Sequence, residues 1–409
     1  MRLLLIAALC LFAGACVSPA EPPETGTAIT GATIYAAPDA APVPGGVILI
    51  HDGRILSAGP AGSVAVPAGF EIIDGRGLFA VAGYWNSHAH LVGEDMTDPA
   101  GASDDDLSAY FTNAYVRHGF TTLVDLASET RLALGVASRI DTSDIKAPRL
   151  LTAGSPFYPP GGTPIYARPI YEAYGLPSAE IVDAESAVAR LEAQADAGAR
   201  AVKLFTGAIV GEPIGVMPMA DEHVRALTDA ARRKGLPVFA HPTDTEGLRV
   251  AVENGVDILA HAAPLSGDWT DGRAADMAQR GIGMTPTLHL FELFPHPATP
   301  VELAVAQAAA LQAAGGDILF GTDAGFSPGY DPAGEWALMH RFMDWRGLLA
   351  AMTTVPARRL GEAGERGEIA AGQVADIVLL GADPAEDFRH LGAAVLVMKD
   401  GRIIFERGE

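Results

Sequence analysis

Residues 236–262 read LPVFAHPTDTEGLRVAVENGVDILAHA, and the order of apolar and polar residues here predicts a repeating unit. The apolar run LPVFAH has the length of a buried strand. A segment with helical periodicity follows it, with Thr243 or Asp244 as the capping residue. The second apolar run, VDILAHA, predicts the next strand. Because a helix connects the two runs, we expect them to lie parallel in one sheet. Each run ends in a histidine, His241 and His261.

The same alternation continues on both sides of this unit. Helical segments precede the runs RAVKLF, GIGMTPTLHL and DILFGTDAG, and the upstream runs LFAVAGYWNSHAH, GFTTLVDLAS and PRLLTAG complete a set of eight. Eight strand–helix alternations over about 280 residues predict an α/β fold of the (β/α)8 TIM barrel type. An open doubly wound sheet is the rival interpretation. It requires a glycine-rich phosphate turn after an early strand, and the sequence has none.

Both ends of the chain show a different pattern, in which short runs of β-forming residues are separated by turn signals. The Asp-Gly turns are Asp52-Gly53, Asp74-Gly75 and Asp400-Gly401. We therefore predict a small β-sandwich built from both termini, residues 25–80 plus 365–409, and a barrel over residues 81–364.

The first residues carry the features of an export signal. Arg2 precedes an apolar run over residues 3–12 that is too short to span a bilayer, and small residues lead to Cys16. The ending Ala-Gly-Ala-Cys resembles a bacterial lipobox, with residues 17–24 as a tether. We predict an exported protein, periplasmic or an outer-membrane lipoprotein, that touches the membrane only through a lipid anchor at Cys16. Simple cleavage and secretion is the alternative.

Charge and cysteine content exclude several classes of function. The chain of 409 residues has 28 Lys plus Arg against 50 Asp plus Glu, a net charge of −22, which argues against a nucleic-acid partner. Both cysteines, Cys10 and Cys16, lie in the predicted leader. The folded part therefore cannot use a thiolate, and a metal there must be held by His, Asp, Glu or a modified side chain.

Chelating side chains gather at the ends of the predicted strands. The candidate metal ligands are His88, His90, Lys203, His241, His261 and Asp323. Strand ends of a barrel converge on one mouth, and His88 and His90, two apart on a strand, face the same side. Each residue alone has an ordinary structural explanation, but together they predict a site for a divalent ion such as zinc.

Lys203 is the most informative of these residues. The chain has four lysines against twenty-four arginines, and this lysine sits inside an apolar run. A buried ammonium is costly and usually loses its proton. A neutral amine can react with carbon dioxide to give a carbamate, an anionic group that bridges two metals. A salt-bridged lysine at a strand end, or a one-metal site with a neutral lysine, remains open as an alternative.

These residues resemble the amidohydrolase superfamily, in the branch that pairs a barrel with a composite β-sandwich. The motifs that carry the likeness are the His-x-His at 88–90, HGFTTLVD (118–125), GARAVKLF (198–205), FAHPTDTEGLRVAVENGVDILAHA (239–262), FGTDAG (320–325), TTVPARRLG (353–361) and GEIAAGQVADIVLL (367–380). The likeness is strongest to Xaa-Pro dipeptidases and imidazolonepropionases.

The resemblance implies a hydrolase of C–N bonds with two divalent ions, expected to be zinc. His88, His90 and Asp323 would hold one ion. His241 and His261 would hold the other, and carboxylated Lys203 would bridge the two. Asp323 would carry the proton from the attacking water to the leaving amine. The substrate would be a small molecule or a dipeptide, and the likeness to Xaa-Pro dipeptidases implies a dipeptide of Xaa-Pro type cleaved by an exported dipeptidase.

Substrate-binding residues are harder to identify from sequence. The candidates are Tyr158, Tyr166 and Arg168 in the loop after the third strand, and His289 after the seventh. Arg168 is suited to clamp a substrate carboxylate, as a dipeptide would need. Other functions stay open: a mononuclear deaminase or cyclic amide or imide hydrolase, a lactonase or esterase, and a non-catalytic surface lipoprotein. Oligomeric state is not predicted.

Overall fold

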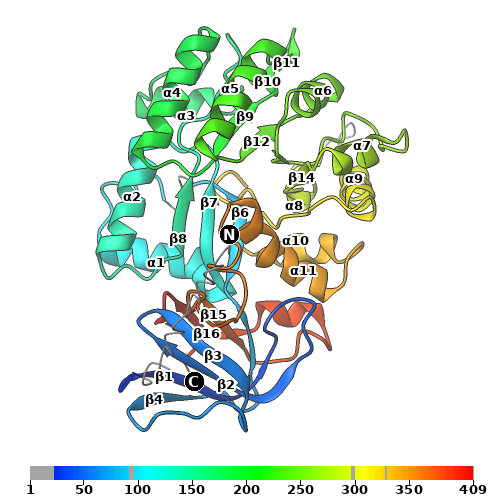
Figure 1. Cartoon of the computed structure of the whole chain (residues 1–409). Coiled ribbons are helices and arrows are strands. Elements are labelled where there is room, and N and C mark those ends of the chain that lie inside the picture. Colours follow the sequence, from blue (N-terminus) through cyan, green and yellow to red (C-terminus); the bar gives the residue numbers. More distant parts are fainter. Residues whose placement is uncertain (1–22, 92–95, 296–299, 328, 409) are drawn as a thin grey trace, which may run out of the picture.

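The computed structural model describes residues 23–91, 96–295, 300–327 and 329–408. The predicted leader (1–16), its lipidation site Cys16 and most of the tether (17–24) lie outside the described residues. The chain forms a TIM-barrel-type α/β fold with a separate sheet, and Figure 1 shows the sheet below the barrel strands. None of the described helices is long and apolar enough to cross a bilayer.

The strands follow the chain in this order. Those of the first half are β1 (Gly26–Ile34), β2 (Val43–His51), β3 (Arg54–Pro60), β4 (Phe70–Asp74), β5 (Phe79–Ala82), β6 (Tyr84–Ala89), β7 (Phe120–Asp125) and β8 (Arg149–Thr152). Those of the second half are β9 (Val202–Phe205), β10 (Gly207–Gly211), β11 (Gly215–Pro218), β12 (Val238–His241), β13 (Ile258–Leu259), β14 (Gly283–Met284), β15 (Ile377–Leu380), β16 (Ala394–Lys399) and β17 (Arg402–Glu406).

Helices alternate with the central strands. They are α1 (Asp104–Ala114), η1 (Val116–His118), α2 (Thr130–Thr142), α3 (Arg168–Tyr174), α4 (Ala184–Ala197), α5 (Asp221–Lys234), α6 (Thr245–Glu253), α7 (Arg273–Gln279), α8 (Leu288–Leu293), α9 (Val301–Ala313), α10 (Ala333–Met339), α11 (Trp345–Met352), α12 (Thr354–Arg359) and η2 (Phe388–Gly392). The side chain of Asp244 accepts a hydrogen bond from the Gly247 N–H and caps α6, so Asp244, not Thr243, is the capping residue.

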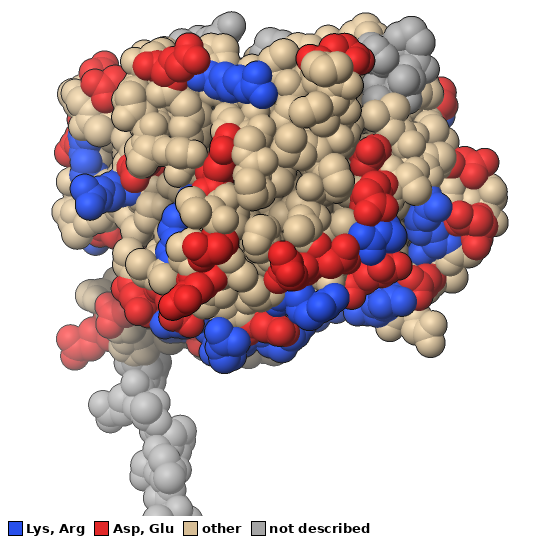
Figure 2. Space-filling model, turned by 90° about the horizontal axis from the view of Figure 1, so that it is seen from above, with Lys and Arg blue, Asp and Glu red and all other residues tan. Residues whose placement is uncertain are grey.

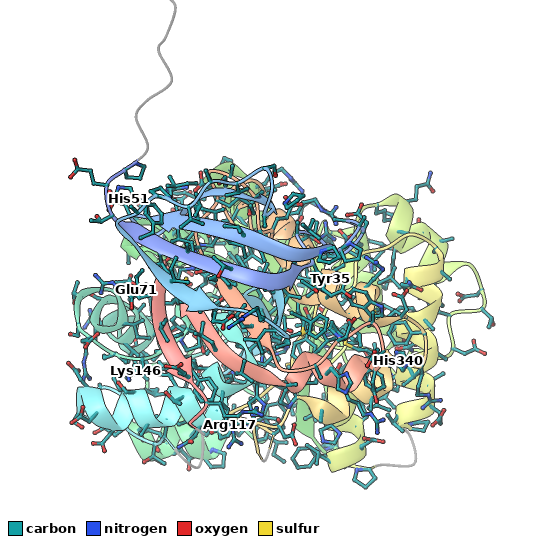
Figure 3. All side chains as sticks on the ribbon, turned by 90° about the horizontal axis from the view of Figure 1, so that it is seen from below. Tyr35, His51, Glu71, Arg117, Lys146 and His340 are labelled. Atoms are coloured by element: carbon teal, nitrogen blue, oxygen red, sulfur yellow. The ribbon has the colours of Figure 1, made fainter. Side chains whose placement is uncertain are left out.

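Strands from both ends of the chain share one eight-stranded sheet. Its order is β17-β16-β15-β5-β1-β2-β3, with β4 also paired to β1. Figure 3 shows the N-terminal strands in blue beside the C-terminal strands in red. The antiparallel pair β15–β5 joins the two ends directly, in register Ile377 to Ala82. Buried isoleucines and leucines from both termini, including Ile29, Ile48 and Leu379, pack in one apolar cluster of this sheet.

Two of the three predicted Asp-Gly turns close hairpins, and the third does not. Asp52-Gly53 connects β2 to β3 and Asp400-Gly401 connects β16 to β17, each pair with positive φ at both residues. Asp74-Gly75 was expected to do the same, but β4 and β5 both pair with β1 in parallel. The Gly75 N–H donates to the Thr30 carbonyl, which keeps the chain running along the same edge of β1.

The central strands form two parallel sheets, β6-β7-β8 and β14-β13-β12-β9. Parallel bridges connect their edges, Phe157 to Leu204 on one side and Met284 to Ile318 and Ala89 to Ala324 on the other. The seventh and eighth predicted strands are therefore much shorter than the apolar runs suggested. The last three residues of the seventh run, 288–290, belong to α8, and the described part of the eighth run contributes backbone bridges only.

Charged residues are spread over the surface. On the face seen in Figure 2, acidic side chains are intermixed with basic ones, mostly toward the edge. Many of the basic side chains form ion pairs with acidic neighbours, as Arg249 does with Asp221 and Glu246. Basic side chains on this face are therefore distributed and do not form one continuous surface.

Candidate metal centre and active-site cavity

A cavity of about 660 Å³ lies at the carboxyl ends of the barrel strands. All six of the metal ligands suggested by the sequence line it. Two come from the end of β6 and the residue after it, one from β9, one from the end of β12 and one from just after β13. The sixth lies in the eighth segment, residues 317–325. Residues up to 235 positions apart are thus brought to one wall, because parallel strands all end on the same side.

His88, His90 and Asp323 form the tightest group. One side-chain nitrogen or oxygen of each lies within 4.8 Å of the others. Nε2 of His90 lies 2.7 Å from Oδ1 of Asp323, and Nε2 of His88 lies 3.3 Å from the same oxygen. His88 and Asp323 are buried, at 0% and 3% exposure, while His90 reaches toward the cavity.

The hydrogen bonding of His88 shows whether this group fits a cation. Nδ1 of His88 lies 2.7 Å from the Ala260 carbonyl oxygen, which only accepts, so Nδ1 carries the proton. Burial, with the positive charge of Lys203 as a second cause, holds the pKa of His88 well below its usual value. Nε2 therefore has a lone pair, it is buried, and it has no hydrogen-bond partner among the described residues. A metal ion is the partner that suits this nitrogen and the facing carboxylate.

His261 and His241 continue the site on the side of His88. The ring centres of His88 and His261 are 4.6 Å apart, and those of His261 and His241 are 4.5 Å apart. Nδ1 of His261 lies 2.8 Å from the hydroxyl of Thr287, and the His241 ring stacks on Phe205. Burial lowers the pKa of both imidazoles. Neutral imidazole is the form that binds metals.

Lys203 lies at the floor of the cavity and is 1% exposed. It pairs with Phe239 across β9 and β12, and its Nζ lies 5.4 Å from the centre of the Phe205 ring. Burial lowers the pKa of Lys203 to about 7, although the charge of Asp323 acts in the opposite direction. A substantial share of the amine is therefore neutral near neutral pH, as reaction with carbon dioxide requires.

Backbone and side-chain contacts hold the ligands in place. Asn86 donates to the Thr322 hydroxyl at 2.8 Å, and its Oδ1 accepts from the backbone N–H of His88. The bond from Asn86 to Thr322 connects β6, the first strand of the barrel, to the residue just before Asp323. Asp323 itself has φ of 56°, in the left-handed region. Gly321 is needed beside it, since a Cβ there would lie 2.3 Å from Cγ2 of Thr285 and 2.7 Å from Cβ of His88.

A buried carboxylate that sequence reasoning missed supports the same wall. Asp125, at the end of β7, accepts from the hydroxyls of Ser128 and Thr152 and from the Leu91 N–H. Burial raises its pKa, and the three donors oppose that effect. Asp125 is the last residue of HGFTTLVD, so a polar residue ending an apolar run was the available signal. It anchors the chain just after His90.

The structure places two of the four candidate substrate residues at the cavity and two outside its described lining. Tyr158 and Tyr166 line the cavity. Arg168 is exposed at the start of α3 and donates to the carbonyls of Thr163 and Val210. His289 lies in α8, with Nδ1 2.9 Å from Glu292. Neither Arg168 nor His289 is among the described residues that line the cavity.

Most of the remaining lining is apolar, and sequence reasoning did not single it out. It includes Phe205, Phe291, Phe294 and Phe326 together with Ile170 and Leu265. Four of these are large apolar side chains that remain 38–49% exposed, which is uncommon and marks a binding surface. The signal available in the sequence was aromatic residues in loops after strands, as in FELF at 291–294.

Barrel strands that present imidazoles and a carboxylate at their carboxyl ends define a class of metal-dependent hydrolase. The chain belongs to the amidohydrolase family, whose sequence pattern matches residues 79–404. It is therefore a hydrolase that acts on carbon–nitrogen bonds. Imidazolonepropionase of Symbiobacterium thermophilum is 27% identical over 91% of this chain and 92% of that protein.

Solved structures agree with this assignment. A putative prolidase from Bifidobacterium longum superposes with a TM-score of 0.76, at 25% identity, covering 95% of this chain and 96% of that one. A Xaa-Pro dipeptidase with methionine in its active site superposes with the same TM-score, at 20% identity, covering 93% of this chain and all of that one. The predicted resemblance to the Xaa-Pro dipeptidase and imidazolonepropionase branch is confirmed.

Proposed function

We propose that the protein is a binuclear metal-dependent hydrolase of amide bonds, built on a closed barrel with a sandwich from both termini. The observation that carries the proposal is the buried, unpartnered Nε2 of His88 facing the Asp323 carboxylate. His88, His90 and Asp323 would hold one ion, and His241 and His261 the other. A carbamate on Lys203 would bridge them. It forms when the neutral amine bonds to the carbon of carbon dioxide and releases one proton.

Bound divalent ions would lower the pKa of water and polarise a carbonyl at this wall. The chain's own residues supply the rest. The carboxylate of Asp323, a residue of the cavity lining, can hold the proton that the attacking water loses as its oxygen bonds to the carbonyl carbon. Asp323 then returns that proton to the amide nitrogen, so an N–H bond forms as the C–N bond breaks. Tyr158 and Tyr166, at the cavity wall, would contact the substrate.

A mononuclear enzyme of imidazolonepropionase type is the second candidate. It is favoured by the compactness of the His88, His90 and Asp323 group compared with the two later imidazoles. Peptidase activity toward Xaa-Pro dipeptides is a narrower version of the first candidate. It needs a cation for the terminal carboxylate, and Arg168, the residue suggested for this role, donates instead to two backbone carbonyls.

Metal content and activity together test the proposal. Protein purified without chelator should contain two zinc ions per chain and hydrolyse amides from a mixed panel of acyl amides, dipeptides and cyclic ureides. One ion per chain, with activity restricted to cyclic substrates, would favour the mononuclear candidate. A metal-loaded protein that cleaves no C–N bond in the panel would refute the catalytic mechanism proposed here.

We also propose that the protein is exported and lipidated at Cys16. The support is the leader sequence alone, with its short apolar run and the Ala-Gly-Ala-Cys ending. Cells fed labelled palmitate should incorporate label into the wild-type protein and not into Cys16→Ser, with Cys10→Ser as the matched control. An unlabelled wild-type protein in the culture fluid would show cleavage and secretion instead.

A further inference from the structure

We propose that the cavity binds hydrophobic amides that carry aryl or alkyl groups on both sides of the scissile bond. The groups distal to that bond carry no carboxylate. The inference rests on the proposed amide hydrolysis, because it names the substrate class of the same site. Two independent observations carry it: the apolar character of the lining, and the sign of the charges along it.

Apolar side chains form a contact surface in the same cavity as the metal ligands. Phe326 lies 4.9 Å from Tyr166 and 6.1 Å from Phe294, measured between ring centres. Phe294 is 49% exposed, Ile170 42% and Leu265 40%. Large apolar side chains kept in contact with water beside a catalytic centre gain when an apolar ligand covers them. Rings at these spacings are suited to edge-to-face packing with an aryl group.

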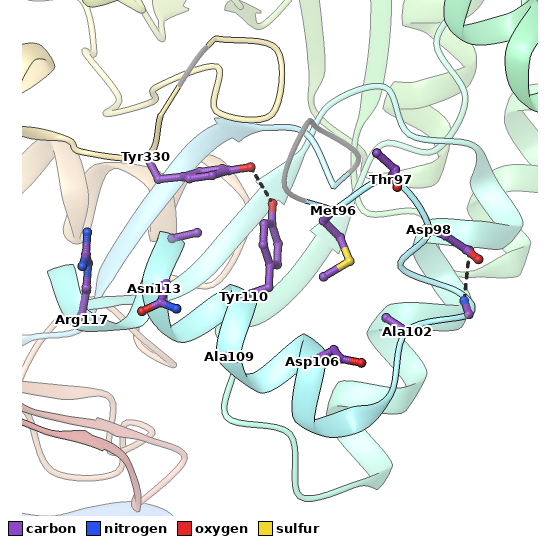
Figure 4. Close-up of a pocket in the computed structure, with 12 residues that line it drawn as sticks. Met96, Thr97, Asp98, Ala102, Asp106, Ala109, Tyr110, Asn113, Arg117 and Tyr330 are labelled. Atoms are coloured by element: carbon purple, nitrogen blue, oxygen red, sulfur yellow. Dashed lines mark hydrogen bonds between the residues drawn. The ribbon is translucent and has the colours of Figure 1, made fainter.

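The charged groups along the cavity exclude an anionic distal group. Apart from the metal ligands, the charged residues of the described lining are Asp98 and Glu129, both acidic. Their carboxylates accept backbone hydrogen bonds from Gly101 and Leu132, and neither forms an ion pair within the described part of the chain. Figure 4 shows Asp98 bonded in this way. A distal carboxylate would meet acidic neighbours and apolar surface, at a cost in free energy.

Outside the proposed metal site, the described lining offers no cation to offset this. Lys203 is the single Lys or Arg of the described lining and belongs to the proposed metal site. Two nearby guanidinium groups, those of Arg168 at the start of α3 and of Arg190 in α4, donate to backbone carbonyls. The segments 92–95 and 296–299, which the structure does not describe, contain neither Lys nor Arg in their sequence. The chemistry of the cavity therefore differs from that of a site built for free dipeptides.

Matched substrates that differ in one charge test the inference. We would compare the phenylacetyl amide of 4-aminobenzamide with that of 4-aminobenzoate, which share size, scissile bond and leaving-group geometry. We expect kcat/KM to be at least tenfold higher for the neutral compound. Equal or reversed values would overturn the substrate class while leaving amide hydrolysis intact.

A binding measurement separates this inference from the proposed function. The corresponding ketones, in which CH2 replaces the amide N–H, cannot be hydrolysed and are titrated into the full-length protein by calorimetry. Tighter binding of the neutral ketone by tenfold or more supports the substrate class even if no amide is cleaved. Equal affinity, or tighter binding of the carboxylate, overturns it.

Two variants assign the effect to named residues. Asp98→Asn keeps the acceptor for Gly101 and removes one negative charge, so the preference for the neutral ketone should fall about threefold. Phe326→Ser should weaken both ketones by fivefold or more. Ile72→Ser, at a 54% exposed position in the sheet, is the control and should change neither. A Phe326→Ser protein with wild-type affinities would count against the apolar contact surface.

Discussion

Nε2 of His88 and Oδ1 of Asp323 lie 3.3 Å apart inside the protein, and neither atom carries a proton that it could donate to the other. The proton of His88 is on Nδ1, where the Ala260 carbonyl accepts it, and a carboxylate has none to donate. Two buried lone pairs that face each other at this distance repel unless a cation lies against both. This relationship gives the first prediction.

Removal of metal should destabilise the folded chain as well as stop hydrolysis. Because a bound ion relieves the repulsion between His88 and Asp323, zinc at about 100 times its Kd should stabilise the protein by about 2.7 kcal/mol. Thermal unfolding with and without chelator measures this difference. His88→Ala should reduce the response to zinc to the part contributed by the ion that His241 and His261 would hold.

His51→Ala is the matched control for this experiment. His51 ends β2, is not among the described residues that line the cavity, and contacts the Thr25 carbonyl (Figure 3). The control should keep the full response to zinc. A His88→Ala protein that zinc stabilises as strongly as wild type would contradict the assignment of Nε2 as a ligand.

Lys203→Ala should reduce the metal content from two ions to one per chain, with activity lowered by at least 100-fold. The reason is that the proposed carbamate holds both ions, whereas a methyl group binds neither. Elemental analysis measures the ions, and native mass spectrometry of the wild-type protein should detect the added mass of one carbon dioxide. Bicarbonate in the growth and assay buffers should raise wild-type metal content but not that of the variant.

Lys146→Ala removes a lysine outside the cavity and should behave as wild type in all three measurements. If Lys203→Ala retains two ions, the bridging role is wrong and the mononuclear or free-amine alternatives must be reconsidered.

Gly321→Ala should misplace the metal ligands. The new Cβ would lie 2.3 Å from Cγ2 of Thr285 and 2.7 Å from Cβ of His88, so the backbone beside Asp323 must shift. Overpacking of this kind costs about 1–3 kcal/mol in unfolding free energy, measured by urea denaturation. Zinc affinity should fall with it. Thr285→Ser removes one of the two clashing atoms, so the double variant should recover part of the loss.

Gly62→Ala provides the comparison, because a Cβ at that position has no atom within 4 Å. Its stability should match that of wild type. If Gly321→Ala has the stability and zinc affinity of wild type, the prediction is wrong, and this wall of the cavity accommodates a Cβ without a change in the metal ligands.

The repeating order of strands and helices was readable from sequence because each apolar run is bounded by polar residues. His241 and Asp323 stood out as polar side chains at the ends of apolar runs, which parallel strands bring together, and Lys203 stood out as a lysine inside such a run. The family assignment followed from these positions.

Other features depend on tertiary contacts and could not be read locally. The turn at Asp74-Gly75 looks like a hairpin signal, but β1 captures both flanking strands on one edge. The position of Arg168 is set by carbonyls 5 and 42 residues away in sequence. Apolar residues of the cavity, such as Phe294 and Phe326, resemble core residues in sequence and differ only in what the fold leaves uncovered.

The free energy of unfolding should decrease as pH rises because of Glu335, a buried residue of α10. Its Oε2 accepts the His289 N–H at 2.7 Å, while Oε1 has no hydrogen-bond partner in the described part of the chain, and burial raises the pKa of Glu335 from 4.5 to about 8. The folded state therefore binds a proton that the unfolded state releases between these two values. Its contribution is complete below pH 4.5 and declines as pH rises through 8, by up to about 1.4 kcal/mol per pH unit.

Glu335→Gln keeps the shape and the acceptor but does not ionise, so its unfolding free energy should lack this decline. Urea denaturation of both proteins at about pH 5, 6, 7 and 8, with zinc held constant, gives the difference between them at each pH. That difference should favour wild type most at the lowest pH and shift toward the variant as pH rises. Because Glu335 fixes the backbone beside Thr287, whose hydroxyl contacts His261, zinc affinity of the wild type should weaken over the same range. Parallel stability curves for the two proteins would show that Glu335 ionises equally in the folded and unfolded states.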